Sequence, residues 1–221
     1  MKKKNVLVVA PHPDDETLGL GGTLLKMSKD YNLNLVQASS FNFGKGREKL
    51  QKKYENLQKK IVKMYNFKKV FSLELKATKF DTYEKNHIIS NLNNFIKLTD
   101  TNIVFFPWEN DIHSDHRIIS ECTMACLKSF NNKKIKKALM YETPSETDFN
   151  FKKSFLPNFF VDISKQIKNK IKILKLYKSE VKSHPHPRSI KSVKALSQIR
   201  GSQSGYKNAE SFHLVFEKDE I

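Results

Sequence analysis

Two short segments of this chain concentrate side chains that bind metals and move protons. The first is His12-Pro13-Asp14-Asp15-Glu16, and the second is Asp111-Ile112-His113-Ser114-Asp115-His116. Crowded carboxylates raise one another's pKa unless a cation lies among them, so a divalent metal is the simplest explanation of the first cluster. A turn whose carboxylates only cap the next helix would explain Glu16, but it explains His12 and the Asp pair poorly.

Each cluster directly follows a short apolar run, as expected where a buried strand ends in a loop. The runs are Val6 to Ala10 and Ile103 to Phe106, and a Pro stops each of them. Open α/β sheets bind their ligands beyond the carboxyl ends of the strands. If the two strands lie side by side, His12, Asp15 and His116 can bind one Zn²⁺ and leave a fourth position open for water.

The glycine-rich segment from Thr17 to Met27 follows the first cluster, and we interpret it as a tight turn into a helix. Its spacing is not that of a GxGxxG fingerprint. Three carboxylates ahead of it would also repel a pyrophosphate, which argues against a dinucleotide site.

Together these residues resemble the PIG-L/LmbE-like family of zinc-dependent N-deacetylases. The resemblance rests on the first cluster with its glycines and on His113-Ser114-Asp115-His116 downstream. Tyr177-Lys178-Ser179-Glu180 and the stretch from Arg200 to Phe212 also resemble the tail of bacterial glycan-modifying members. Nearly the whole chain is covered. The resemblance implies an α/β fold, with residues 1–221 forming a single Rossmann-like three-layer domain around a mostly parallel sheet.

The implied reaction is removal of an N-acetyl or other N-acyl group from an amino sugar. Zn²⁺, or another divalent metal such as Fe²⁺, would be held by His12, Asp15 and His116 and would activate water. Asp14 is the predicted general base, because adjacent residues in a bent loop point in different directions.

The second cluster supplies the remaining predicted catalytic groups. His113 would stabilise the oxyanion together with the metal, and Asp115 would orient His113 and favour its protonated form. Either Asp14 or His113 would protonate the leaving amine. Glu16 is expected to be structural, holding a ligand His or capping the helix.

One position departs from the family pattern. Some members carry a Tyr two residues before the first His of the second motif, whereas this chain has Asp111. Tyr141, Tyr206 or His186 would replace that Tyr as an oxyanion donor, or no third group is needed.

Four residues are predicted to contact the substrate. Arg47 opens a helix beside a glycine-rich loop, and Asp81 lies where family members often contact sugar hydroxyls. Their alternatives are a surface Arg and an N-cap for a helix from about Thr82. His186 and Arg188 lie in a Pro-flanked loop that either faces the pocket or is a plain surface loop.

The formal net charge of +17 raises the possibility of a nucleic-acid partner. Only four of the 40 basic residues are Arg, whereas groove-reading proteins use Arg for bidentate base contacts. We therefore expect a solvated Lys-rich surface that helps to capture a phosphorylated or nucleotide-linked sugar. A nucleic-acid binder without catalysis and a metallo-phosphoesterase remain the alternative functions.

The chain is also expected to be a cytoplasmic protein that does not span a membrane. No apolar run approaches the ~20 residues that cross a bilayer, and the signal-like start breaks at Pro11. Cys122 and Cys126 are expected to be reduced and buried, and a homo-oligomer is possible.

Hydrophobic periodicity predicts the remaining elements. The helices are predicted at 47–65, 82–98, 115–130 and 164–179, and further strands at 32–39, 70–75, 138–142, 159–163 and 213–216. Residues 143–158 are predicted to rim the pocket, and residues 201–205 to form a loop.

Overall fold

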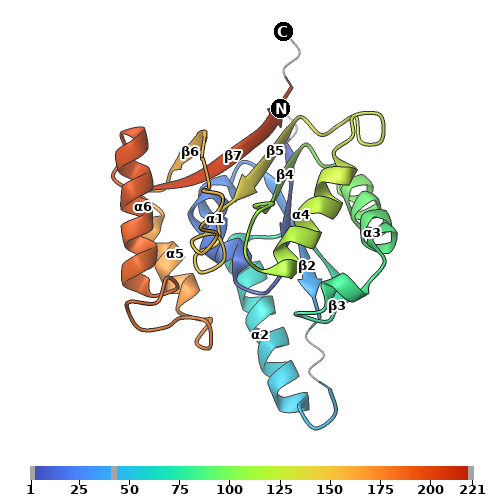
Figure 1. The fold of residues 1–221 in the computed structure, drawn as a ribbon, viewed down its shortest axis with the longest axis horizontal. Coiled ribbons are helices and arrows are strands. Elements are labelled where there is room, and N and C mark those ends of the chain that lie inside the picture. The colour runs from blue at the N-terminus through green and yellow to red at the C-terminus, as the bar shows by residue number, and fades with distance from the viewer. Residues whose placement is uncertain (1–2, 41–43, 219–221) are drawn as a thin grey trace.

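A computed structural model describes residues 3–40 and 44–218 of the chain, so part of the loop before Arg47 lies outside the described residues. One seven-stranded sheet runs through the molecule in the order β3-β2-β1-β4-β5-β7-β6 (Figure 1). The first five strands are parallel, β7 is antiparallel to β5, and β6 is antiparallel to β7. The strands are β1 Asn5–Ala10, β2 Asn32–Ser39, β3 Lys69–Leu75, β4 Ile103–Pro107, β5 Lys137–Tyr141, β6 Phe159–Asp162 and β7 Ala209–Glu217.

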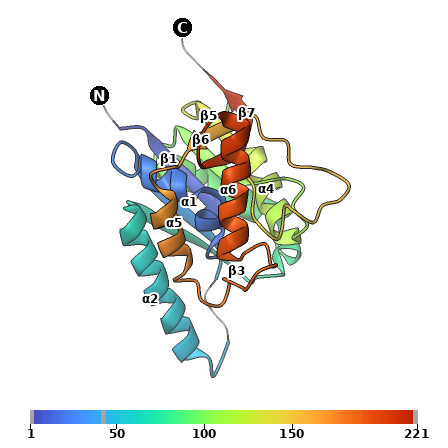
Figure 2. The ribbon, with the colours of Figure 1, turned by 90° about the vertical axis from the view of Figure 1, so that its left-hand side faces the viewer.

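Helices cover both faces of this sheet, as the buried apolar strands require. Alternate residues of the central strands face opposite layers. Leu7 and Val9 pack with α3 and α4, whereas Val6 and Val8 pack with α1, α2 and residues of α5 (Figures 1 and 2). The helices are α1 Asp15–Met27, α2 Glu48–Tyr65, α3 Lys85–Leu98, α4 Ser114–Cys126, α5 Ile167–Leu174 and α6 Ile190–Ser204, and Phe80–Thr82 forms the short helix η1. The three-layer α/β prediction is confirmed.

Several predicted elements need correction. The glycine-rich segment predicted as a turn lies inside α1, where Leu20 alone has non-helical φ and ψ. Only Ile167–Leu174 of the predicted helix 164–179 is helical. Residues 201–205 were predicted as a loop, but 201–204 belong to α6. In α6 the buried positions are Val193, Ser197 and Gly201, so its inner face carries too few apolar residues to show helical periodicity.

The helices and the two cysteines bear on the membrane and redox expectations. Within the described residues, no helix combines the length and apolarity needed to cross a bilayer. Cys122 and Cys126 are unpaired and buried. Burial raises the pKa of the Cys126 thiol to about 12, so it stays protonated.

Gly19 lets α1 pack closely against β5. A Cβ on Gly19 would lie 2.4 Å from Cδ2 of Tyr141. That ring is fully buried, and its hydroxyl donates a 2.9 Å hydrogen bond to the Val9 carbonyl, so it has little room to move. Close packing at this point fixes where α1 begins relative to β1.

Gly19→Ala is therefore expected to lower the free energy of unfolding by ~1–3 kcal/mol, because overpacking displaces a fixed ring. Urea unfolding followed by circular dichroism measures this change. Lys53→Ala, at an exposed position of α2, is the control and should change stability by less than ~0.5 kcal/mol. Equal stability of the two variants would contradict the packing argument.

Candidate active site

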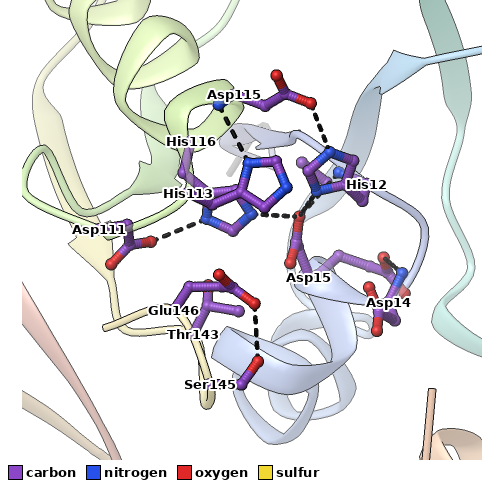
Figure 3. A network of polar contacts seen from close by, with 12 residues as sticks. His12, Asp14, Asp15, Asp111, His113, Asp115, His116, Thr143, Ser145 and Glu146 are labelled. Atoms are coloured by element: carbon purple, nitrogen blue, oxygen red, sulfur yellow. Dashed lines mark hydrogen bonds and ion pairs between the residues drawn. The ribbon is translucent and has the colours of Figure 1, made fainter. Parts of the chain in front are cut away.

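The two clusters meet because β1 and β4 are parallel neighbours, with Val8 opposite Phe105. The loop after β1 leads into α1, and the loop after β4 leads into α4. Both loops therefore open at the same edge of the sheet, as predicted. Figure 3 shows His12 and Asp15 of the first cluster turned toward His113 and His116 of the second.

Three of these side chains converge as a metal site would require. One ligand atom from each of His12, Asp15 and His116 lies within 4.8 Å of the other two. Oδ2 of Asp15 is 3.6 Å from Nδ1 of His12 and 3.3 Å from Nε2 of His116. The structure thus brings together the three predicted ligands.

The outer nitrogen of each ligand His faces a carboxylate. His12 Nε2 lies 2.9 Å from Oδ2 of Asp115, and His116 Nδ1 lies 2.8 Å from Oδ2 of Asp111. Each carboxylate can accept a proton-bearing nitrogen, which leaves the inner nitrogen with a free lone pair. Metal-bound His residues have this arrangement in most proteins.

Two buried atoms support a cation at this place. Among the described residues, His116 Nε2 and Asp15 Oδ1 are buried without a hydrogen-bond partner. His116 Nε2 does lie 3.3 Å from Asp15 Oδ2, but the contact lacks hydrogen-bond geometry. Buried polar atoms are rarely left unpaired, so a positive ion between them fits the donor set.

A second group with metal-binding spacing is less suitable. His12, His113 and Asp115 also offer atoms within 4.8 Å of one another. The Asp115 carboxylate, however, already accepts the backbone N–H groups of Thr78 at 2.7 Å and Phe80 at 3.2 Å. Because its oxygens already accept these backbone hydrogen bonds, they are less available to a metal, and the first group is the better candidate metal site.

Charge also concentrates on His116. Burial alone would lower its pKa, but Asp15 and Asp111 outweigh burial and raise the pKa to about 10. Burial alone would raise the pKa of Asp15, but the neighbouring His116 and His12 outweigh burial and lower it well below its usual value. The metal-free site therefore carries a proton on His116 at neutral pH.

Metal binding is expected to weaken as pH falls, because a protonated imidazole cannot coordinate. Displacing the His116 proton should cost ~10-fold in apparent affinity for each pH unit below about 10. Competition with a chromophoric chelator at pH 6.5, 7.5 and 8.5 measures this slope. Calorimetry in two buffers of different ionisation enthalpy should show proton release, and a pH-independent affinity would contradict the assignment.

Asp14 lies next to the metal cluster in sequence but is not one of its converging ligand groups. The residue is the N-cap of α1, with φ 113° and ψ −25°, and its carboxylate makes no capping hydrogen bond. Oδ2 instead lies 3.1 Å from Nη1 of Arg188. Burial and the neighbouring charge of Asp15 raise the pKa of Asp14 well above its usual value, although Arg188 opposes the shift.

Arg188 is tied to residues of the chain itself. Besides Asp14 it contacts Glu180 at 3.2 Å, Glu146 at 2.8 Å and the Ser145 hydroxyl at 2.7 Å. Arg188 is predicted to contact the substrate, and in the structure its guanidinium is paired with three carboxylates. Ser145 and Glu146 lie in the predicted rim segment 143–158, and neither was expected to contact Arg188.

The relation of Asp115 to His113 differs from the prediction. The carboxylate of Asp115 contacts His12, while its backbone N–H donates to Nδ1 of His113 at 3.1 Å. Burial and the neighbouring rings of His12 and His116 lower the pKa of His113. These influences favour the neutral form of His113, and because Nδ1 accepts the Asp115 N–H, the proton of that neutral form lies on Nε2.

Three other predicted substrate residues are exposed, and among the described residues none belongs to the groups with metal-binding spacing. Arg47 is the N-cap of α2, and Asp81 lies in η1. The N-cap alternative for Asp81 is wrong, because α3 begins at Lys85 with Glu84 as its N-cap. The exposed His186 accepts the Arg188 backbone N–H at Nδ1.

The candidates to replace the family Tyr lie in different surroundings. Tyr141 is committed to the Val9 carbonyl inside the core, and Tyr206 is 46% exposed after α6. Asp111, which occupies the position, is buried and orients His116, while Thr147 donates to its other oxygen at 2.6 Å. The sequence singled out Asp111 as a departure but did not predict this role.

Known proteins resemble this chain over nearly its whole length. A diacetylchitobiose deacetylase of Thermococcus kodakarensis is 25% identical over 96% of this chain and 83% of its own. An N,N'-diacetylchitobiose deacetylase of Pyrococcus horikoshii shares the fold, with a TM-score of 0.76, 19% identity and 96% and 84% coverage of the two chains. A 4-carboxy-2-hydroxymuconate hydratase of Pseudomonas putida shares it with a TM-score of 0.76 at 14% identity, covering 99% and 98%.

A family model also matches the sequence itself. The profile described as "PIG-L: GlcNAc-PI de-N-acetylase" matches residues 7–127, which include both clusters. Since the match covers more than half of the chain, the protein belongs to the PIG-L family of de-N-acetylases.

Proposed function

We propose that this protein is a metal-dependent hydrolase that removes the N-acetyl group of an amino sugar. The observation that carries the proposal is the convergence of His12, Asp15 and His116, with unpaired buried atoms, beside the separately oriented carboxylate of Asp14. We take the metal to be Zn²⁺, which His and carboxylate ligands suit, with Fe²⁺ as the alternative.

Asp14 is the proposed base. When bound, the metal would polarise the acyl carbonyl and make water more acidic. Asp14 would accept the proton from the attacking water, and its raised pKa brings it closer to the operating pH, where a general base is most effective. Arg188 would hold the Asp14 carboxylate in its place on the side facing the rim segment.

His113 is the proposed oxyanion donor. Because its Nδ1 accepts the Asp115 N–H, its Nε2–H is available to the oxygen on which negative charge develops. A neutral His113 keeps this proton, so Asp14, protonated by the water, is the group that returns a proton to the leaving amine. Asp115 would act by fixing His12.

The substrate class follows from the family and the relative. The family description and the name of the Thermococcus protein share an N-acetylglucosamine unit. We therefore propose an N-acetylglucosamine derivative, which the Lys-rich surface would help to capture when it is phosphorylated or nucleotide-linked. Arg47, Asp81 and His186 remain proposed substrate contacts on the exposed surface.

Acetate release is the direct test of this proposal. Purified protein loaded with Zn²⁺ or Fe²⁺ would be incubated with N-acetylglucosamine, diacetylchitobiose and UDP-N-acetylglucosamine, and acetate and free amine would be quantified together. Equal amounts of both products are expected from at least one substrate. A hydratase shares this fold. If neither acetate nor free amine forms and the protein instead hydrates an unsaturated acid, the proposal is contradicted.

A further inference from the structure

One buried carboxylate in the first cluster has no part in the proposed reaction. Glu16 is 1% exposed. Its Oε2 accepts the backbone N–H of Asp14 at 3.1 Å. Its Oε1 accepts the hydroxyls of Thr17 and Tyr177, both at 2.6 Å. Glu16 touches no ligand His, so of its two predicted roles only the contact with the start of the helix is seen.

The backbone that Glu16 holds is strained. Asp14 has φ 113°, a region that side-chain-bearing residues rarely adopt. Such a conformation persists only where surrounding contacts fix it, and the bond from Glu16 is made to the amide on that same φ bond. The Asp14 carbonyl is fixed as well, since it accepts the N–H groups of Thr17 and Leu18.

The side chain of Asp14 shows what this conformation achieves. An Asp at an N-cap ordinarily accepts a backbone N–H of the first turn. Asp14 makes no such bond and is turned toward Arg188. Its neighbour Asp15 meanwhile faces His12 and His116. The twist at residue 14 thus separates two adjacent carboxylates, one for the metal and one for the proton.

We propose that Glu16 is a positioning residue that keeps Asp14 in its strained backbone conformation, and that Tyr177 fixes Glu16 in turn. The proposal rests on the proposed function in that it takes Asp14 to be the base. Tyr177 follows α5, so the C-terminal part of the chain contributes to the orientation of an N-terminal catalytic group.

Two pairs of variants separate this role from simple stabilisation. Glu16→Ala removes the acceptor, whereas Glu16→Gln keeps a carbonyl oxygen for the Asp14 N–H. The amide NH₂ of the Gln can donate to the hydroxyls of Thr17 and Tyr177, which can switch from donor to acceptor. Tyr177→Phe loses the hydroxyl bonded to Glu16, and Tyr65→Phe is its matched control, because the Tyr65 hydroxyl bonds only to Thr17 in this cluster.

The expected result is a graded loss of kcat with one metal retained per chain and KM unchanged. Glu16→Ala should lose ~10²-fold, since small misplacements of catalytic groups have effects of that size. The kcat of Glu16→Gln should stay within ~5-fold of the native value. Tyr177→Phe should lose several-fold in kcat, whereas the kcat of Tyr65→Phe should stay within ~2-fold of the native value. Crystal structures of Glu16→Ala and Glu16→Gln should show Asp14 leaving positive φ only in the first.

Three kinetic outcomes would overturn the proposal: native kcat in Glu16→Ala, a Gln variant no better than Ala, or equal losses in the two Tyr variants. Should Glu16→Ala fail to fold, Glu16→Gln and the Tyr pair still decide the matter. The value of φ at Asp14 needs no substrate. A native protein without deacetylase activity therefore refutes the proposed function, whereas an unchanged φ in Glu16→Ala refutes the positioning role.

Discussion

Replacing Asp14 by Asn is expected to lower kcat for N-deacetylation by ~10²–10⁴-fold while one metal per chain is retained. The carboxylate of Asp14 points to Arg188 and not into the metal cluster, so its loss removes the proton acceptor without removing a ligand. Asn is nearly the same size and can still contact Arg188. Initial rates of acetate release and elemental analysis of the same preparation measure both quantities.

Asp30→Asn serves as the control for this variant. Asp30 is exposed and follows the C-terminal end of α1, whereas the cluster lies at the N-terminal end of that helix. It should keep native kcat and native metal content. If Asp14→Asn instead loses its metal, Asp14 is a ligand. If it keeps native kcat, another group takes the proton from water.

His116→Ala is expected to lose the metal and, with it, at least ~10²-fold of the activity. Its Nε2 is one of three converging ligand atoms and is buried without a hydrogen-bond partner among the described residues. Removing a group that only supports a ligand lowers metal affinity by ~10–100-fold, and removing the ligand itself should cost more. Elemental analysis and chelator competition give the two affinities.

A graded series sharpens this test. Asp111→Asn keeps His116 but weakens its orientation, so its metal affinity should fall by ~10–100-fold. His87→Ala, at an exposed position of α3, should keep the native affinity. Equal metal content in His116→Ala and His87→Ala would mean that the metal, if any, binds elsewhere.

The sequence predicted that the three proposed metal ligands converge, because their positions depend on local features. A β-branched run ending in Pro gives a strand and then a loop, and two parallel strands open their loops at one edge. His12 and Asp15 come from one loop and His116 from the next, so only the pairing of β1 with β4 had to be assumed. That pairing is what the structure shows.

Side-chain contacts between distant segments could not be predicted from residue types and spacing. Arg188 meets Asp14, and Tyr177 meets Glu16, through folding of the C-terminal third, whose α6 buries only small residues and lacks apolar periodicity. The carboxylate of Asp115 turned out to face His12, because side-chain direction depends on the backbone of α4 and on Thr78 and not on spacing. Residue types and spacing locate a site more readily than they assign partners within it.

The measurement that most directly tests the account is acetate release as a function of metal occupancy. Protein stripped by chelation would be titrated with Zn²⁺ or Fe²⁺ in the presence of the best N-acetylamino sugar. Activity should be absent without metal and should rise linearly until one equivalent per chain is bound. Full activity in stripped protein that contains no metal would contradict the role assigned to His12, Asp15 and His116.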